Sequence, residues 1–285
     1  MENNELFQQA QDYITNKQYQ RAQFCLEQLY LQQKNFRNNY YLVRNLNKLA
    51  QHQQAYQIAQ EYLPQYLEDD ELLLFYLNLG FKAKQIIALE QLMLAIRDIL
   101  NDKINLFWQE QLAKYQLDNQ IDLARIKKDF KYLGSLRPFE QRGVLMQAYQ
   151  LTGEDFVEIS RMLLLDSDVH QLIKVQILED LAKLGVTEIN YRNIWQETIT
   201  VNLHELKSVE QTDQYLYYQT KFFDDSMRLQ EIYLKLTLLY PDFSKIDDYS
   251  TWQHVLLNDQ QVAQLSNSLQ KVAQALEEQL TAWIC

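Results

Sequence analysis

The sequence predicts an all-α protein built from antiparallel helical hairpins, and three observations predict it. The 285-residue chain contains only 5 Gly and 3 Pro, where average usage gives roughly 20 and 14. Sheets and long loops need turn residues, so this deficit favours helices with short connections. Apolar residues recur at helical spacing along most of the chain. Ala22, Ala55 and Ala88 are evenly spaced, and such even spacing is typical of arrays whose helical units stack to bury their apolar faces.

The first third of the chain divides into three similar units of two helices each. Polar turns are expected at 15–18, 51–53 and 82–84. The corresponding positions are Ala10, Tyr13, Tyr19, Ala22, Leu26 and Leu29 in the first unit, Val43, Leu46, Ala55, Ala59 and Tyr62 in the second, and Tyr76, Leu79, Ala88, Leu92 and Ala95 in the third. Small residues let two antiparallel helices approach closely, and large residues fill the space between units.

This order of small, aromatic and large residues resembles that of tetratricopeptide repeats over residues 4–100. Pro64 stands where the tetratricopeptide pattern often has a proline that ends the second helix. The glycine that marks the small position of that pattern is absent from all three units. The resemblance implies a right-handed α-solenoid in which the first helix of each unit lines a concave groove. Ankyrin repeats share the period, but their Thr-Pro-Leu-His turn does not occur.

The rest of the chain is expected to be helical but less regular. We expect helices over 101–117, 118–133, 139–151, 154–165, 169–184, 211–240 with a candidate break at 224–226, 250–258 and 260–283. The clearest break is at 134–138, because Pro138 pushes Arg137 out of helical backbone geometry. We therefore expect one domain of tetratricopeptide-like repeats over 1–133 and a second, less regular helical domain over 134–285. The stretch after the break resembles HEAT repeats in texture, and an amphipathic last helix is expected to cap the array.

One segment departs from the helical pattern. Residues 188–191 and 197–201 are rich in β-branched and aromatic side chains with partial alternation, which predicts a short β-hairpin near 187–201. An isolated hairpin is marginally stable, so it must pack on helices or pair with a partner. Two interpretations stay open: a structural insertion with Trp195 as a plug, and an edge strand offered for strand addition.

Acidic residues gather ahead of several apolar runs. They are Asp69-Asp70-Glu71, Asp166-Ser167-Asp168, Asp224-Asp225 and Asp247-Asp248. Carboxylates in the first turn accept hydrogen bonds from free backbone N–H groups and oppose the helix dipole. We interpret these residues as helix caps rather than as metal or acid–base clusters.

No sequence motif for catalysis or cofactor binding is present. The four histidines, His52, His170, His204 and His254, lack metal-ligand spacing, and no Cys-x-x-Cys or His-Glu-x-x-His occurs. Five scattered glycines exclude a Gly-rich phosphate loop, and no Gly-x-Ser-x-Gly elbow exists. We therefore expect no enzymatic activity, no metal and no cofactor.

The charge and the cysteine content limit the classes of partner and the cellular compartment that we expect. The formal net charge of -11 disfavours binding to nucleic acid and to anionic membranes. No stretch approaches the ~20 apolar residues of a membrane span, and the acidic start at 1–5 lacks the basic region of a secretory signal. Two cysteines form no disulfide framework; Cys25 is expected in the core and Cys285 at the surface. We expect a cytoplasmic protein.

Projection of the repeat geometry gives a candidate peptide-binding surface. The inward positions of the first helix are Arg37, Tyr40, Tyr41, Arg44, Asn47 and Lys48 in the second unit, and Leu73, Leu74, Leu77 and Phe81 in the third. Guanidinium groups and an amide are suited to holding a carboxylate or an extended backbone. The apolar wall of the third unit suits one large side chain. A second basic cluster of Arg125, Lys127, Lys128 and Lys131 is interpreted as a solvated helix face.

The function expected from these observations is non-catalytic binding of a protein or peptide, with an acidic group, through the concave face of the array. Two alternatives remain. The first is a peptide-responsive regulator without a DNA-binding module of its own. The second is an enzyme with an unrecognised helical active site. The sequence leaves the oligomeric state open.

Overall fold

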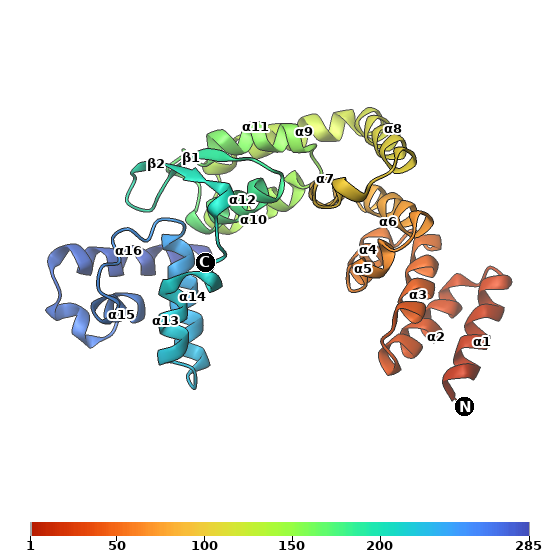
Figure 1. The fold of residues 1–285 in the computed structure, drawn as a ribbon, viewed down its shortest axis with the longest axis horizontal. Coiled ribbons are helices and arrows are strands. Elements are labelled where there is room, and N and C mark those ends of the chain that lie inside the picture. Colours follow the sequence, from red (N-terminus) through yellow and green to blue (C-terminus); the bar gives the residue numbers. More distant parts are fainter. Residues whose placement is uncertain (1, 285) are drawn as a thin grey trace. The chain divides into compact units, whose positions relative to one another are not determined.

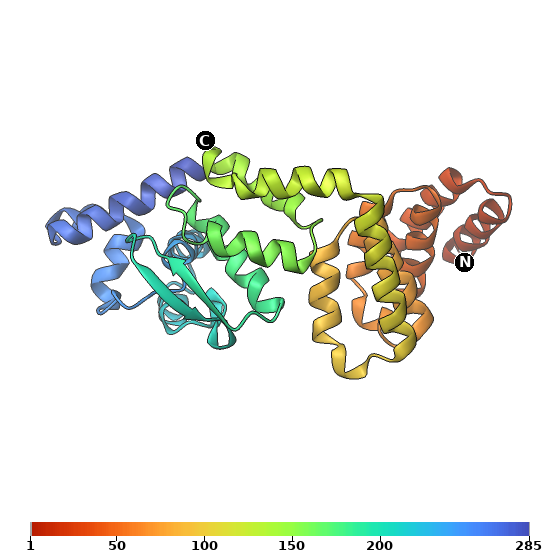
Figure 2. The ribbon, with the colours of Figure 1, turned by 90° about the horizontal axis from the view of Figure 1, so that it is seen from above.

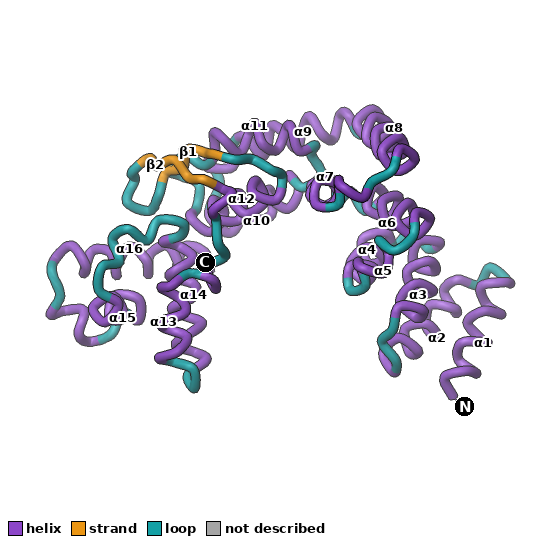
Figure 3. The backbone as a smooth tube through the Cα atoms, viewed as in Figure 1, coloured by secondary structure: helices purple, strands orange, loops and turns teal. Residues whose placement is uncertain are grey.

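The computed structural model describes residues 2–284, with side chains over 5–283, and is mostly helical with one small two-stranded antiparallel sheet (Figures 1 and 3). The predicted predominance of helix and the predicted β-hairpin are confirmed. Contacts divide the chain into two compact units, Met1–Ile121 and Asp122–Cys285. The boundary expected at 133/134 falls within the second unit, at the 3-10 turn Leu133–Ser135. Cys285 lies outside the described residues.

The first unit is a succession of helices. They are α1 (Glu2–Thr15), α2 (Tyr19–Gln32), α3 (Phe36–Lys48), α4 (His52–Gln60), α5 (Leu63–Tyr66), α6 (Asp70–Lys82), α7 (Ile86–Ala95) and α8 (Asp102–Asp118). The main contacts run from α1 to α2, α2 to α3, α3 to α4, α4 to α6 and α6 to α8 (Figure 1). Packing in this unit is therefore chiefly between elements close in the chain.

One turn geometry recurs between the two helices of each hairpin. Lys17, Ala50 and Lys84 all adopt the left-handed backbone conformation, with φ of 59°, 58° and 56°. The glutamine that follows each of them donates its backbone N–H to the carbonyl five residues earlier: Gln18 to Tyr13, Gln51 to Leu46 and Gln85 to Gly80. This is the bond that closes a Schellman motif at a helix C-terminus. The interval from Gln18 to Gln51 equals that from Ala22 to Ala55, but the interval from Gln51 to Gln85 is one residue longer.

The extra residue shifts the third hairpin out of the period of the three alanines. Ala22 and Ala55 come four residues after their turn glutamines and are fully buried, and the equivalent position in the third hairpin is Leu89, also fully buried. Ala88 is only half-buried. A Cβ on Gly80 would lie 2.6 Å from the Leu89 side chain. In the second hairpin, the residues equivalent to Gly80 and Leu89 are Leu46 and Ala55. The large residue is therefore on the first helix in the second hairpin and on the second helix in the third.

The second unit joins segments that are far apart in the chain. Its elements are α9 (Gln120–Lys131, beginning at the boundary), α10 (Pro138–Ala148), α11 (Gly153–Leu163), α12 (Gln171–Lys183), β1 (Glu188–Arg192), β2 (Thr198–Asn202), α13 (Asp213–Lys221), α14 (Ser226–Leu239), α15 (Tyr249–Leu257) and α16 (Asn267–Ile284). The last helix contacts α10, α14 and α15, and α12 contacts α14. The stretch expected over 211–240 is two helices, and they are separated at the candidate break, where Asp225 caps α14.

The two strands pair in register Ile189 with Val201 and Tyr191 with Ile199 (Figure 2). Ile189, Tyr191 and Val201 are buried, whereas the alternate residues of β2 are exposed. The Tyr191 hydroxyl donates to the Tyr240 carbonyl at 3.0 Å. One face of the hairpin thus packs on its own unit, as a two-stranded sheet requires for stability.

Most of the predicted caps are confirmed. Asp69 accepts from the N–H groups of Glu71 and Leu72, and Asp225 and Asp248 cap α14 and α15 in the same way. Asp166 differs, because it accepts from Asp168 within a turn, and His170 caps the following helix instead. Cys25 is buried, as expected.

Candidate functional site

The basic and aromatic residues expected on one face of α3 are exposed or half-buried in the structure. Arg37 is exposed, and its guanidinium lies 4.2 Å from the ring centroid of Phe7 on α1. Arg44 is also exposed and lies 5.4 Å from the ring centroid of Tyr40. Tyr41 makes an edge-to-face contact with Phe7 at 4.9 Å. Stacking on aromatic rings orients both guanidinium groups while their N–H donors stay accessible.

Asn47 and Tyr40 connect this surface of α3 to α6. Asn47 is half-buried, and its Oδ1 accepts a hydrogen bond from Lys82 Nζ at 3.5 Å. Lys48 is exposed. Tyr40 is half-buried and packs against Phe75 of α6, with ring centroids 5.8 Å apart. The second and third hairpins therefore contribute to one surface at these positions.

The apolar wall expected on α6 differs in the structure. Leu77 is fully buried and cannot contact a ligand. Phe81 is 8% exposed and packs on Trp108 and Tyr115 of α8. Leu74 is half-buried.

The longer interval before the third turn explains why Leu77 is buried. Under the longer interval, which separates Gln51 from Gln85, the α6 residue equivalent to Arg44 is Asn78, and the residue equivalent to Lys48 is Lys82. Under the shorter interval, which separates the alanines, the equivalents of the same two residues are Leu77 and Phe81. The polar positions of α6 that correspond to the basic face of α3 are therefore Asn78 and Lys82.

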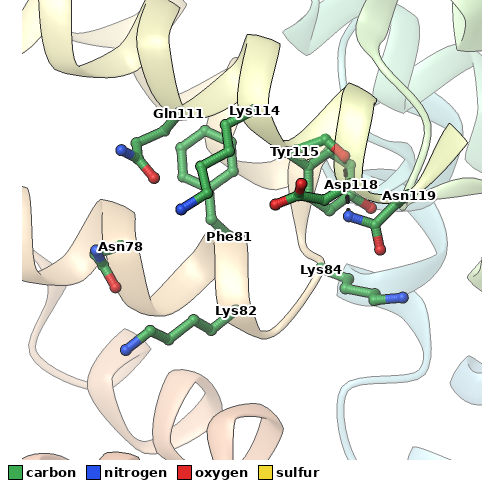
Figure 4. Close-up of a pocket in the computed structure, with 9 residues that line it drawn as sticks. All are labelled: Asn78, Phe81, Lys82, Lys84, Gln111, Lys114, Tyr115, Asp118 and Asn119. Carbon is green, nitrogen blue, oxygen red and sulfur yellow. Dashed lines mark hydrogen bonds between the residues drawn. The ribbon is translucent and has the colours of Figure 1, made fainter.

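A cleft of about 330 Å³ lies between α6 and α8, and we call it the α6–α8 cleft. Its lining residues are Asn78, Phe81, Lys82, Lys84, Gln111, Lys114, Tyr115, Asp118 and Asn119. Gln111 and Lys114 on α8 extend toward the side of Asn78 and Lys82 on α6, with Phe81 between the two helices (Figure 4). The cleft thus has an aromatic floor and a rim of amides and ammonium groups.

The electrostatics of this region oppose the acidic balance of the whole chain. Lys82, Lys84 and Lys114 line the cleft against one carboxylate, Asp118. Among residues 5–283, no carboxylate lies within ion-pair distance of Arg44, Lys48, Lys82 or Lys114. Burial lowers the pKa of the His52 imidazole, and the Lys82 ammonium lowers it further. The combined surface of α3 and the cleft is therefore cationic.

A buried polar network holds α3 in place behind this surface. Asn39 is fully buried, donates to Ile58 O at 2.7 Å and accepts from the Tyr66 hydroxyl at 3.0 Å. Tyr30 donates to Glu61 at 3.0 Å, and burial raises the pKa of its hydroxyl to about 12, with Glu61 acting in the same direction and Asn39 opposing. Because satisfied buried networks fix a single packing arrangement, the basic and aromatic face of α3 is preorganised.

The cleft residues on α8 are the functional candidates that sequence reasoning missed. From the sequence alone, the helices expected over 101–117 and 118–133 are assigned to the less regular part of the chain. Gln111 and Lys114 nevertheless follow Asn78 and Phe81 by the same interval that separates the three alanines, and all four line the same cleft. Continuing that interval from α6 into α8 would have found them.

The second basic cluster is partly neutralised. Arg125 pairs with Asp122 at 3.7 Å, and Lys127 pairs with Asp155 at 2.6 Å. Ion pairing of this kind agrees with the interpretation as a solvated helix face rather than a binding patch.

No family model matches the chain, and no curated protein or solved structure matches it either. Within the described residues, no three His, Cys, Asp or Glu side chains gather in a way that could hold a metal ion. No helix in that same range is both long enough and apolar enough to cross a membrane.

Proposed function

We propose that this chain is a non-catalytic scaffold whose first unit is a tetratricopeptide-like right-handed solenoid. The recurring left-handed turn at Lys17, Ala50 and Lys84 supports a repeat architecture. The succession of contacts between neighbouring hairpins supports it as well, because repeat proteins bury their cores between adjacent units.

The bound partner in this proposal is an extended peptide segment that carries acidic and apolar side chains. One observation carries the proposal: the cations Arg44, Lys48, Lys82 and Lys114 lack acidic partners among the described residues. Two of them, Lys82 and Lys114, line the α6–α8 cleft together with amide and aromatic side chains. Amides hold peptide backbone groups, ammonium and guanidinium groups bind carboxylates, and the aromatic lining of the cleft contacts an apolar side chain.

The test is to pan a displayed random-peptide library against the wild-type protein and to resynthesise the enriched peptides. We expect enrichment of Asp or Glu close to a large apolar residue. Affinity should fall roughly tenfold or more in Arg44→Glu, Lys48→Glu, since charge-assisted hydrogen bonds are lost and repulsion is added.

The matched control is Arg97→Glu, Lys103→Glu, which changes the net charge equally at exposed residues that line neither α3 nor the cleft. Circular dichroism establishes that both variants are folded. Equal affinities for the two variants, or a library with no acidic enrichment, would refute the proposal.

A further inference from the structure

The second unit contains a separate cavity of about 510 Å³. It lies between the loop that joins β1 to β2, α15 and α16. Its walls are formed mainly by Ile194, Trp195, Trp252, Leu269, Val272 and Ala275. This volume and this predominantly apolar lining are those of a small-molecule site.

The Trp195 side of the cavity is held in place by hydrogen bonds. The backbone N–H of Trp195 donates to Asn193 Oδ1 at 3.0 Å. Asn193 is 1% exposed and also donates to Asp242 at 2.9 Å. The Lys245 ammonium lies 4.6 Å from the Trp195 ring centroid. The loop is therefore fixed by its own contacts before any ligand binds.

A buried donor at the cavity wall has no acceptor. Trp252 is 1% exposed, and its indole Nε1 makes no hydrogen bond with the described residues. Buried donors are nearly always paired in folded proteins, and a buried indole N–H ordinarily finds a partner. The nitrogen itself is buried, so the ring contributes apolar surface to the cavity wall.

Two lysines add positive charge to the cavity lining. Lys245 pairs with Glu197 at 2.8 Å, so its charge is already balanced. Lys271 is exposed, and no carboxylate in the described range lies within ion-pair distance of it. An uncompensated ammonium beside an apolar cavity favours a ligand with one negative charge and an apolar body.

We propose that this cavity binds a small carboxylate with an apolar body. The body packs against Trp195, Trp252 and Val272, while the carboxylate accepts from Lys271. The site lies wholly in the second unit, so it does not depend on the peptide surface proposed for the first.

The experiment titrates the full chain with octanoate and follows the indole N–H signals of its 4 tryptophans by two-dimensional nuclear magnetic resonance. Single Trp→Phe variants assign the signals. We expect saturable shifts at Trp195 and Trp252, with Trp108 and Trp283 as internal references because neither lines the cavity. The neutral probe 1-octanol should bind roughly tenfold more weakly, since it lacks the charge-assisted bond.

Variants locate the carboxylate. Lys271→Gln should weaken octanoate binding roughly tenfold and leave octanol binding unchanged. Lys207→Gln is the control, because it removes an exposed lysine of the same unit that does not line this cavity.

Three results would overturn the proposal. Absence of shifts at millimolar octanoate would show that the cavity takes no such ligand. Equal affinities for octanoate and octanol, or equal effects of Lys271→Gln and Lys207→Gln, would show that no carboxylate site exists. Shifts of similar size at all four indoles would show non-specific association.

Discussion

The two units of this chain bury their cores in different ways. In the first unit the main contacts join helices that are neighbours in the chain, from α1 through α8. In the second unit the last helix returns to contact α10, α14 and α15. When contacts are local, a perturbation unfolds only the helices next to it. When a segment distant in the sequence completes the core, the whole unit unfolds cooperatively.

Polar groups at the contacts of α16 emphasise this difference. Lys235 is fully buried on α14 and pairs with Glu231 at 2.8 Å and with Glu277 of α16. His170 is buried, stacks on Trp283 and contacts Gln279 O at 2.9 Å. The contact between His170 and Gln279 joins residues 109 positions apart, so α16 is held against a distant segment of the chain.

The largest expected effect compares two fully buried leucines, Leu77 on α6 and Leu276 on α16. Each Leu→Ala change should cost about 2–5 kcal/mol in the unit that carries it, because a cavity is left. Leu276→Ala should lower amide protection throughout α10, α14 and α15. Leu77→Ala should lower it in α4 to α8 and leave α1 and α2 protected. Hydrogen exchange read by mass spectrometry checks both expectations.

Phe223→Ala serves as the control, since Phe223 is 76% exposed and its truncation should change stability by no more than about 0.5 kcal/mol. The comparison fails if Leu77→Ala unprotects the whole first unit, or if Leu276→Ala acts on α16 alone.

An intermediate effect on stability is expected at Gly80 and Leu89, which contact each other in the third hairpin. Gly80→Ala should destabilise the first unit by about 1–3 kcal/mol, because the new Cβ meets the Leu89 side chain at 2.6 Å. Adding Leu89→Ala should make the effect of Gly80→Ala much smaller, since the clash is then absent. A double-mutant cycle by urea denaturation measures this coupling. A cycle with additive costs would mean that the two residues do not press on each other.

The smallest expected effect is a pH dependence specific to the second unit. Burial lowers the pKa of His170, and the contact with Gln279 O opposes this shift only in part. Because the unfolded chain then binds the proton more tightly, stability is complete above the ordinary histidine pKa of 6.5 and falls as pH drops below it. The loss is limited to about 1.4 kcal/mol per pH unit.

His170→Asn should flatten this dependence, since asparagine also caps helices but does not titrate in this range. Protection of α12 and α16 measured between pH 7 and pH 5.5 tests it. The matching His52→Asn change should affect only the first unit, where the pKa of His52 is likewise lowered. An unchanged slope in His170→Asn would assign the acid sensitivity to other groups.

The sequence by itself determined the elements. Scarcity of Gly and Pro, apolar spacing, capping aspartates such as Asp69 and β-branched runs around 187–201 are local signals, and local hydrogen bonding and backbone entropy respond to them directly. The basic and aromatic face of α3 could also be predicted, because helical periodicity fixes which residues share a face.

Only the tertiary structure decided how these elements fit together. A constant period places Ala88 and Leu77 at contact positions, but in the structure Leu89 packs against Gly80 and the third hairpin is offset by one residue. The cleft exists because α8 packs on Phe81, and the second unit closes because Lys235 and His170 meet α16. Each of these outcomes depends on side-chain volumes and charges from separate segments, which no local pattern encodes.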